Sequence, residues 1–139
     1  MTAGCIFCSI VAGSAPAHVV EEDARTIAFM DINPLVRGHV LVVPRAHAAE
    51  LWEMAIDDGA ALMRMTQRIA GAVHAAFAPD GVNLFHATGA AAGQTVFHVH
   101  MHVVPRWDGD AFRPPTIPQR GVDPDLDTPA EAIRVALRS

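Results

Sequence analysis

Three histidines at alternate positions, His98, His100 and His102, lie in a run of branched and aromatic residues that constrains the fold more than any other part of the chain. Such residues favour a β-strand over residues 95–104, and side chains alternate between the two faces of a strand. The three imidazoles would therefore share one face, while the apolar residues between them would join the core. Pro105 has no N–H to donate to a ladder, so we expect the strand to end there.

The remaining apolar pattern predicts further short strands and one long helix. Turn-forming residues separate apolar runs at 17–21, 26–30, 39–43 and 82–85. Apolar residues recur every three or four positions up to Phe77, which predicts an amphipathic helix with Asp57 or Asp58 as its N-cap. A short helix or turn is expected at 5–12. Because strands follow one another with few helical crossovers, we expect an α+β fold with an antiparallel sheet of about five strands.

The length of 139 residues and a hydrophobic share of 51% are enough for one domain with a core. We assign residues 1–107 to that core, and 108–139 to a proline-rich segment and a short C-terminal helix packed on the same domain. In that helix, Thr128 and Glu131 have the spacing of a capping box. The proposed docking stripe consists of Ile133, Ala136 and Leu137.

Charge and cysteine content exclude several classes of protein. The formal charge is −5 and no run of basic residues occurs, which argues against nucleic acid as a partner. No stretch approaches the roughly 20 apolar residues of a membrane span, and no secretory leader is recognisable, so we expect a cytoplasmic protein without a membrane partner. The only cysteines, Cys5 and Cys8, are too close together to staple a secreted fold.

The spacing of the histidines separates two chemistries. Neighbouring rings on one strand face stand roughly 6.6 Å apart and the outer pair roughly 13 Å apart, so one metal ion cannot easily bind all three. A neutral imidazole can instead attack phosphorus or a carbonyl, and crowded rings disfavour protonation of one another. His100, in the middle, is the best placed nucleophile. The small residues before the strand, ending in Gly93, Gln94 and Thr95, would let backbone N–H groups approach a phosphate.

These residues are part of a wider resemblance. The run from Gly93 to Arg106, the pair Ile6 and Phe7, the block from Phe29 to Pro34 and the segment from Gly38 to His47 together make the chain similar to the histidine triad (HIT) nucleotide hydrolases and transferases. The resemblance covers about residues 5–106. It implies a HIT-like fold and a homodimer in which two small antiparallel sheets join into one, with a site in each subunit.

The resemblance also implies a reaction and a set of site residues. His100 would attack the α-phosphorus of a nucleotide conjugate, with purines the favoured bases, and water would then hydrolyse the nucleotidyl-histidine, as in a phosphoramidase or a dinucleoside polyphosphate hydrolase. No organic cofactor is implied. His98 would orient His100, and His39 would support the site. Phosphate would be held by His102, Gly93, Gln94 and Thr95, the base by Ile6, Phe7, Ile32 and Leu41, and the ribose by Asp31.

Some of these positions have a simpler interpretation. Ile6, Phe7 and Leu41 are also ordinary core residues, and Asp31 is also a common opener of turns. The chain departs from many relatives at Ala87, where they carry an amide. That polar contact is either missing or supplied by His86 or Thr88.

The two cysteines form a Cys-x-x-Cys motif that needs two further ligands to bind zinc. The resemblance supplies them as His47 and His98, which gives a structural site of Cys5, Cys8, His47 and His98. His98 would bind the metal through one nitrogen and position His100 through the other. Two buried thiols without metal are the alternative.

Two other functions stay open on the sequence. One is a catalytically weak nucleotide-binding or scaffold protein, which would bind adenosine nucleotides without turnover. The other is a zinc-dependent hydrolase with its metal at the triad itself, whose turnover would be abolished by chelation.

Overall fold

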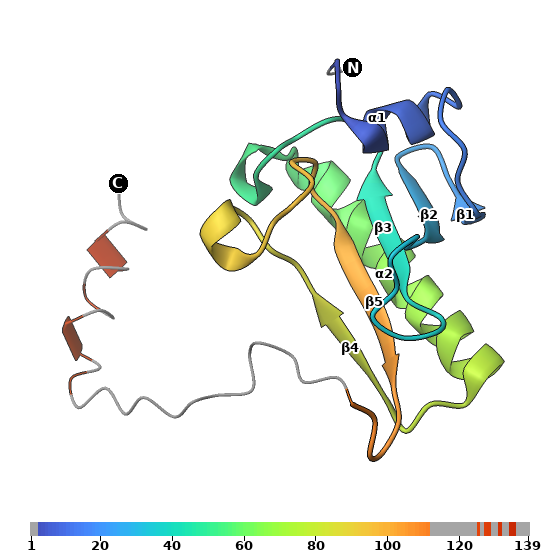
Figure 1. Cartoon of the computed structure of the whole chain (residues 1–139). Coiled ribbons are helices and arrows are strands. Elements are labelled where there is room, and N and C mark those ends of the chain that lie inside the picture. Colours follow the sequence, from blue (N-terminus) through green and yellow to red (C-terminus); the bar gives the residue numbers. More distant parts are fainter. Residues whose placement is uncertain (1–2, 112–124, 126, 129–130, 132–133, 136–139) are drawn as a thin grey trace.

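A five-stranded antiparallel sheet with one long helix on its face forms the body of the protein (Figure 1). The computed structural model describes residues 3–111, 125, 127–128, 131 and 134–135. In chain order the elements are α1 (Ile6–Val11), β1 (Val19–Glu22), β2 (Thr26–Met30), β3 (Val40–Pro44), the 3-10 turn η1 (Leu51–Glu53), α2 (Ile56–Phe77), β4 (Gly81–Phe85), the 3-10 turn η2 (Ala90–Ala92) and β5 (Met101–Arg106). The strand order is β1-β2-β3-β5-β4, so the predicted α+β fold is confirmed.

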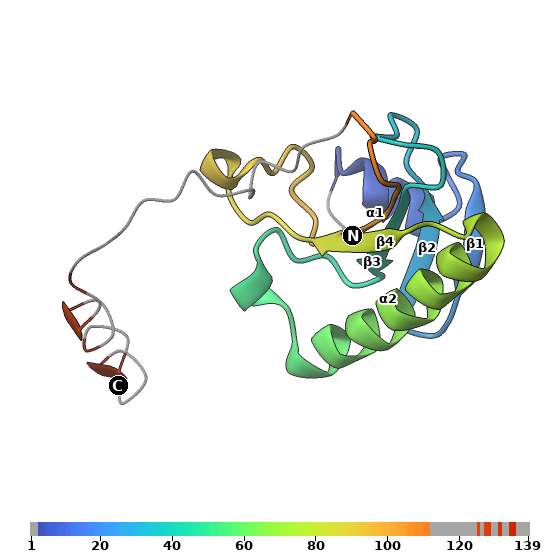
Figure 2. The ribbon, with the colours of Figure 1, turned by 90° about the horizontal axis from the view of Figure 1, so that it is seen from below.

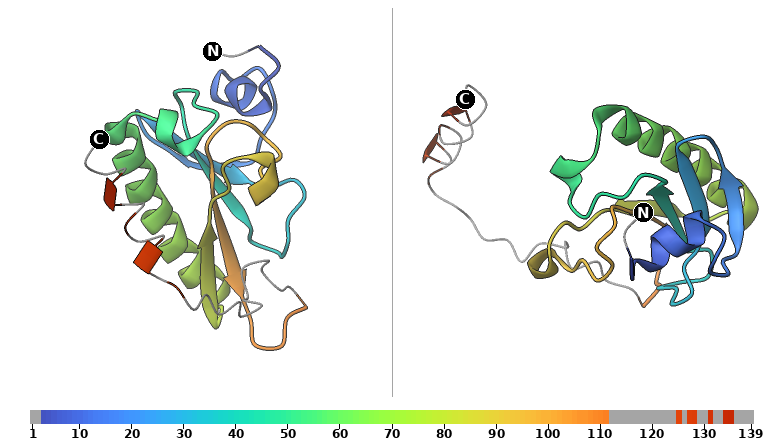
Figure 3. Two further views of the ribbon diagram at one scale, coloured as in Figure 1. Left: turned by 90° about the vertical axis from the view of Figure 1, so that its left-hand side faces the viewer. Right: turned by 90° about the horizontal axis from the view of Figure 1, so that it is seen from above.

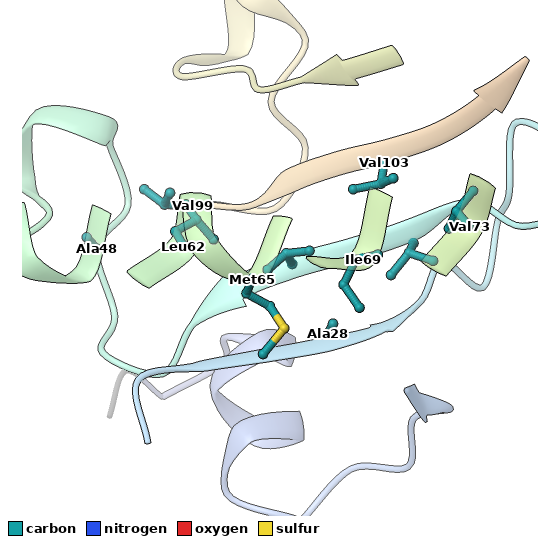
Figure 4. Packing of buried hydrophobic residues seen from close by; sticks show 10 residues of the cluster. Ala28, Ala48, Leu62, Met65, Ile69, Val73, Val99 and Val103 are labelled. Atoms are coloured by element: carbon teal, nitrogen blue, oxygen red, sulfur yellow. The ribbon is translucent and has the colours of Figure 1, made fainter. Parts of the chain in front are cut away.

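The sheet has a different apolar layer on each face. Figures 2 and 3 show α2 along one face and the short α1 on the other. Under α2 lie small and branched side chains, including Ala28 and Val103 (Figure 4). On the α1 face the core is smaller and holds Phe7, Ile27, Phe29, Leu41 and Val43. Since strand residues alternate between faces, β2 and β3 contribute to both layers.

The register of the central strands decides which layer the histidines join. Leu41 pairs directly with His102, so these two side chains share the α1 face. Val103, the next residue, is buried against α2. The functional side of the sheet is therefore the side that α2 leaves uncovered.

The histidine strand is shorter than predicted and begins later. β5 spans Met101–Arg106, so only His102 of the three histidines lies in it. Before it the chain leaves the ladder, and the N–H of Val99 donates to the carbonyl of Ala48 at 2.8 Å. Pro105 lies inside β5 and does not end it, because pairing with β3 stops at Val103 and only β4 accompanies the strand further.

The long helix matches its prediction except at its cap. The N-cap is Ala55, not Asp57 or Asp58, and both aspartates lie in the first turn. Carboxylates there are favourable because they face the positive end of the helix dipole. Asp58 also pairs with Arg25 at 2.9 Å. The C-cap is Ala78, which is left-handed with φ 47° and directly precedes Pro79.

The C-terminal prediction is corrected at its cap and otherwise falls outside the described residues. Asp127 and Thr128 are already helical, and their N–H groups donate to Oδ1 of Asp125. Asp125 therefore caps this turn in place of Thr128. The predicted docking residues 133, 136 and 137 and most of the proline-rich segment are not among the described residues. Within the part of the chain that is described, no helix is long and apolar enough to cross a membrane.

Gly38 lies where the end of α2 packs against the sheet, beside Phe77 and Pro105, and its substitution tests this packing. Its φ is +93°, and a Cβ there would lie 2.8 Å from the ring of Phe77 and 3.1 Å from Pro105. Gly38→Ala should lower the free energy of unfolding by about 1–2 kcal/mol, because the backbone is strained and the Phe77 ring must move. Urea denaturation measures the change. Gly71→Ala, in a helical site with open space, is the matched control and should be neutral or slightly stabilising; equal effects of the two substitutions would contradict this account.

Candidate functional site

A cavity of about 350 Å³ opens on the α1 face and collects most of the predicted site residues. Its walls come from α1, from the central strands and from the loops that follow β2 and precede β5. Of the predicted residues, the lining includes Ile6, Phe7, Asp31, Ile32, Leu41, Thr95, His100 and His102. Gly93 and Gln94 are not part of it.

Both interpretations hold for Phe7 and Leu41, whereas Ile6 is not a core residue. Phe7 and Leu41 belong to the core cluster and also form the floor of the cavity. Ile6 and Ile32 are exposed, at 50% and 81%, and contribute no core. The lining also contains Ile10 and Phe29, which the sequence analysis did not select. Helical spacing from Ile6 and cross-strand pairing of Phe29 with Leu41 are the signals that could have found them.

His100 is held as a neutral ring with one free nitrogen. Its Nδ1–H donates to the carbonyl oxygen of His98 at 2.7 Å, so Nε2 keeps its lone pair. Burial lowers the pKa of His100, which is only 5% exposed. The ring of Phe7 meets it edge-on, with the centroids 5.1 Å apart. The result is an unprotonated imidazole at the cavity wall, which is the state a nucleophile requires.

The hydrogen bond from His39 determines which ring nitrogen of His102 carries the proton. The N–H of Leu35 donates to Nδ1 of His39 at 3.1 Å, so the proton of His39 is on Nε2. That Nε2–H donates to Nδ1 of His102 at 2.9 Å, and His102 therefore carries its own proton on Nε2. Burial, with the nearby His100 and His39, lowers the pKa of His102 to about 3. His102 is thus a neutral hydrogen-bond donor near pH 7.

Asp31 is the one formally charged side chain among the described residues that line the cavity. Its Oδ1 accepts the N–H of Asn33 at 2.8 Å, which is the turn-opening role. Its Oδ2 lies 3.5 Å from Nε2 of His39. Asp31 therefore opens a turn and also faces the cavity.

His98 does not orient His100 through its ring. The ring Nε2–H of His98 donates to the carbonyl of Pro44 at 2.8 Å, and its Nδ1 points toward the cysteines. The orienting group is instead the backbone carbonyl of His98. The expected link between the two residues exists, but the imidazole of His98 has no part in it.

The resemblance assigns the backbone near Gln94 to the phosphate, but the backbone N–H of Gln94 donates to the carbonyl of Gly89 at 3.1 Å, and its side chain is also bonded within the protein. The side-chain amide nitrogen donates to the carbonyls of Ala49 and Val96, and Oε1 accepts the N–H of Gly89. The side chain is buried, and all these bonds go to backbone groups. Gln94 therefore shapes the loop before the histidines, and its side chain is not available to a phosphate.

The predicted zinc ligands converge at the N-terminus of α1. Sγ of Cys5 lies 3.5 Å from Nδ1 of His98, Sγ of Cys8 lies 3.3 Å from Nδ1 of His47 and 3.6 Å from Nδ1 of His98, and the two nitrogens are 3.2 Å apart. A tetrahedral zinc with bonds of about 2.3 Å to sulfur and about 2.0–2.1 Å to nitrogen places its ligands about 3.6 Å apart for sulfur and nitrogen and about 3.3 Å for two nitrogens. The residues therefore fit zinc in type, number and separation.

A second group, Asp31, His39 and His102, also brings ligand atoms within 4.8 Å of one another. Here the two nitrogens are 2.9 Å apart, which is shorter than the separation on a shared zinc and normal for a hydrogen bond. The donor from Leu35 also accounts for the tautomer of His39. The geometry at the triad is thus that of a hydrogen-bonded pair and gives no support to a metal there.

Comparison with known proteins agrees with this geometry. The HIT domain family matches residues 12–109. The "Protein hit" of Bacillus subtilis is 40% identical over 109 residues, or 78% of this chain and 75% of that protein. "Adenylylsulfatase HINT3" of Arabidopsis thaliana is 38% identical over 108 residues, covering 78% of this chain and 55% of that protein. The crystal structure of a Zn-bound histidine triad family protein from Mycobacterium smegmatis is similar with a TM-score of 0.74 and 40% identity, over 97% of this chain and 94% of that one.

The low pKa of His102 makes a prediction about stability and pH. The unfolded imidazole titrates near 6.5 and the folded one at about 3, so below pH 6.5 the unfolded chain binds more protons and stability falls as the pH falls. As the pH falls from 6.5 to 5, the free energy of unfolding in urea should decrease with a slope from this residue that steepens toward about 1.4 kcal/mol per pH unit. His102→Asn should flatten that slope, and the exposed His74→Asn should leave it unchanged; a slope that does not respond to His102→Asn would refute the assignment.

Proposed function

Because the chain belongs to the HIT domain family, we propose that it is a nucleotide hydrolase or nucleotidyl transferase that cleaves at the α-phosphate through a covalent intermediate on His100. The observation that carries the proposal is the bond from Nδ1–H of His100 to the carbonyl of His98. It leaves Nε2 unprotonated on a residue that lines a cavity large enough for a ligand.

In the first step Nε2 of His100 attacks the α-phosphorus, a phosphorus–nitrogen bond forms, and the bond to the leaving group breaks. The leaving group departs with the bonding electrons and takes a proton from solvent. The positive charge that develops on the imidazole is stabilised because Nδ1–H stays bonded to the carbonyl of His98. Water then attacks the phosphorus, releases the nucleoside monophosphate and a proton, and restores the neutral ring.

The other polar groups of the cavity would bind rather than react. His102 would donate its Nε2–H to a phosphoryl oxygen, and Thr95 would contribute its backbone and hydroxyl. Asp31 would accept hydrogen bonds from ribose hydroxyls through Oδ2. The apolar walls would hold the base, and the adenylylsulfatase name of one relative supports a purine conjugate as the substrate.

We also propose that zinc binds Cys5, Cys8, His47 and His98 as a structural ion in the cytoplasm, where thiols remain reduced. The zinc-bound relative supports this assignment. When bound, the ion would hold α1, and hence Ile6 and Phe7, against the sheet. No step of the proposed reaction uses it.

The homodimer implied by the resemblance would form through β4. The two edges of the sheet are β1 and β4. β1 is irregular in register and carries Glu21 and Glu22, features that discourage pairing with another strand. β4 is regular and uncharged, and its Leu84 is 43% exposed. Joining of two β4 strands would merge the sheets of two subunits.

His100→Ala should lower turnover of an adenosine 5′-phosphoramidate by several orders of magnitude and leave nucleotide binding largely intact, because the nucleophile is lost while the cavity remains. Steady-state kinetics measure the turnover, and calorimetry measures the binding of AMP. In the wild type, an early quench without acid followed by mass spectrometry should locate an AMP adduct on His100. His74→Ala is the control. Adenosine binding without turnover by the wild type would favour the scaffold alternative.

Zinc content provides a separate test. The purified protein should contain about one zinc per chain, and Cys8→Ser should lose it and reduce the free energy of unfolding by about 2 kcal/mol or more, since metal binding contributes to folding. Metal analysis and urea denaturation measure these effects, with Ser9→Ala as the neighbouring control. Full zinc content in Cys8→Ser would rule out this site, and complete loss of turnover in chelated but folded protein would favour the zinc-dependent hydrolase.

A further inference from the structure

The backbone that carries His100 lies outside the sheet and needs other anchors. Residues 95–100 precede β5, so the ladder bonds of the sheet do not fix them. The β4–β5 register ends with Phe85 opposite His102, and two further positions in the same register would place Ala87 opposite His100. The chain turns away before that pair forms.

Beyond the end of the ladder, a side chain forms the hydrogen bond to the backbone of His100. Nδ1 of His86, the first residue after β4, lies 3.0 Å from the carbonyl oxygen of His100. Nε2 of the same ring lies 2.6 Å from the hydroxyl of Thr88. Neither residue lines the cavity that contains His100 and His102.

The direction of each hydrogen bond in this network is determined. The hydroxyl of Thr88 accepts the N–H of Leu51 at 3.2 Å and donates its own hydrogen to Nε2 of His86. The carbonyl oxygen of His100 can only accept, so Nδ1 of His86 carries the ring proton and donates it to that carbonyl, which leaves Nε2 as the acceptor for the hydroxyl of Thr88. Three successive bonds connect the 3-10 turn η1 to the peptide of the proposed nucleophile, and bonds in such a chain polarise and strengthen one another.

We propose that His86 is a positioning residue for His100, holding the peptide carbonyl of the nucleophile where the β4–β5 ladder has ended. This inference rests on the proposed function of His100. Together with the bond from Val99 to Ala48, it fixes both ends of the short segment whose carbonyl at His98 orients the His100 ring. Loss of the His86 donor should loosen that ring and affect the chemical step more than the binding of substrate.

Two amide substitutions separate the role of each ring nitrogen. In His86→Asn the amide nitrogen stands where Nδ1 stood and can still donate to the carbonyl of His100. In His86→Gln the amide reaches the place of Nε2 and that donor is lost. We expect His86→Gln to lower kcat for adenosine 5′-phosphoramidate about tenfold with KM within about twofold of the wild type, and His86→Asn to keep kcat within about threefold. His74→Gln is the control for a histidine substitution on the surface.

A spectroscopic measurement keeps the test independent of turnover. In ¹⁵N NMR the wild-type His100 ring should show a single Nδ1–H tautomer, which His86→Asn retains and His86→Gln converts to a mixture. Equal behaviour of the two variants in both measurements, or a change in KM alone, would overturn the proposal. If the wild type turns over no nucleotide, the proposed function fails, and the tautomer comparison alone decides the role of His86.

Discussion

The hydrogen bond between the ring of His100 and the carbonyl of His98 sets the character of the whole site. A neutral imidazole has one donor and one acceptor nitrogen, and whichever nitrogen meets a carbonyl must carry the proton. The carbonyl of His98 therefore decides that Nε2 is the basic nitrogen. The same logic runs through His39 and His102, where a backbone N–H at Leu35 fixes the first tautomer and hence the second. Backbone groups outside the cavity thus determine which ring nitrogens of the cavity can attack and which can donate.

The position of the site follows from the way the sheet is covered. The long helix occupies one face and buries the small residues of β2, β3 and β5. Among the described residues, the helix on the opposite face is six residues long, and the cavity lies on that face. His98 connects the two centres on this side, because its ring belongs to the cysteine cluster while its peptide belongs to His100. One residue therefore places the proposed metal and the proposed nucleophile at a fixed separation.

Much of this arrangement could be predicted from the sequence. Alternation put His102 and Val103 on different faces of the strand, and the spacing of apolar residues predicted α2, with its N-cap two or three residues too late. What failed were features that depend on tertiary context. β propensity extended the strand back to residue 95, but the loop carrying Gln94 is tied to the backbone of Ala49 and Val96 and does not join the ladder. The proline rule failed at Pro105, since the rule applies only where both sides of a strand are paired.

The site residues were predicted in type more reliably than in role. Motif resemblance selected His98 and Gln94, but it could not show that His98 meets His100 through its carbonyl or that the Gln94 side chain is bonded to the backbone of its own loop. His86 was noticed only as a substitute for a missing amide, because its real partner, the carbonyl of His100, is fourteen residues away. Hydrogen bonds to backbone groups leave no pattern in a single sequence, and this is the information that the structure added.

The six-residue length of α1 has a consequence for how the cavity opens. A helix this short is not stable through its own backbone hydrogen bonds. The free-energy cost of nucleating a helix exceeds the stabilisation from the hydrogen bonds of about one and a half turns. The order of α1 depends on the insertion of Phe7 into the core and on the anchoring of Cys5 and Cys8 beside His98. The N-terminal wall is therefore the part of the domain that can detach while the strands remain folded. Amide exchange in Ile6–Val11 would then proceed through a local opening and report on access to the cavity rather than on global unfolding.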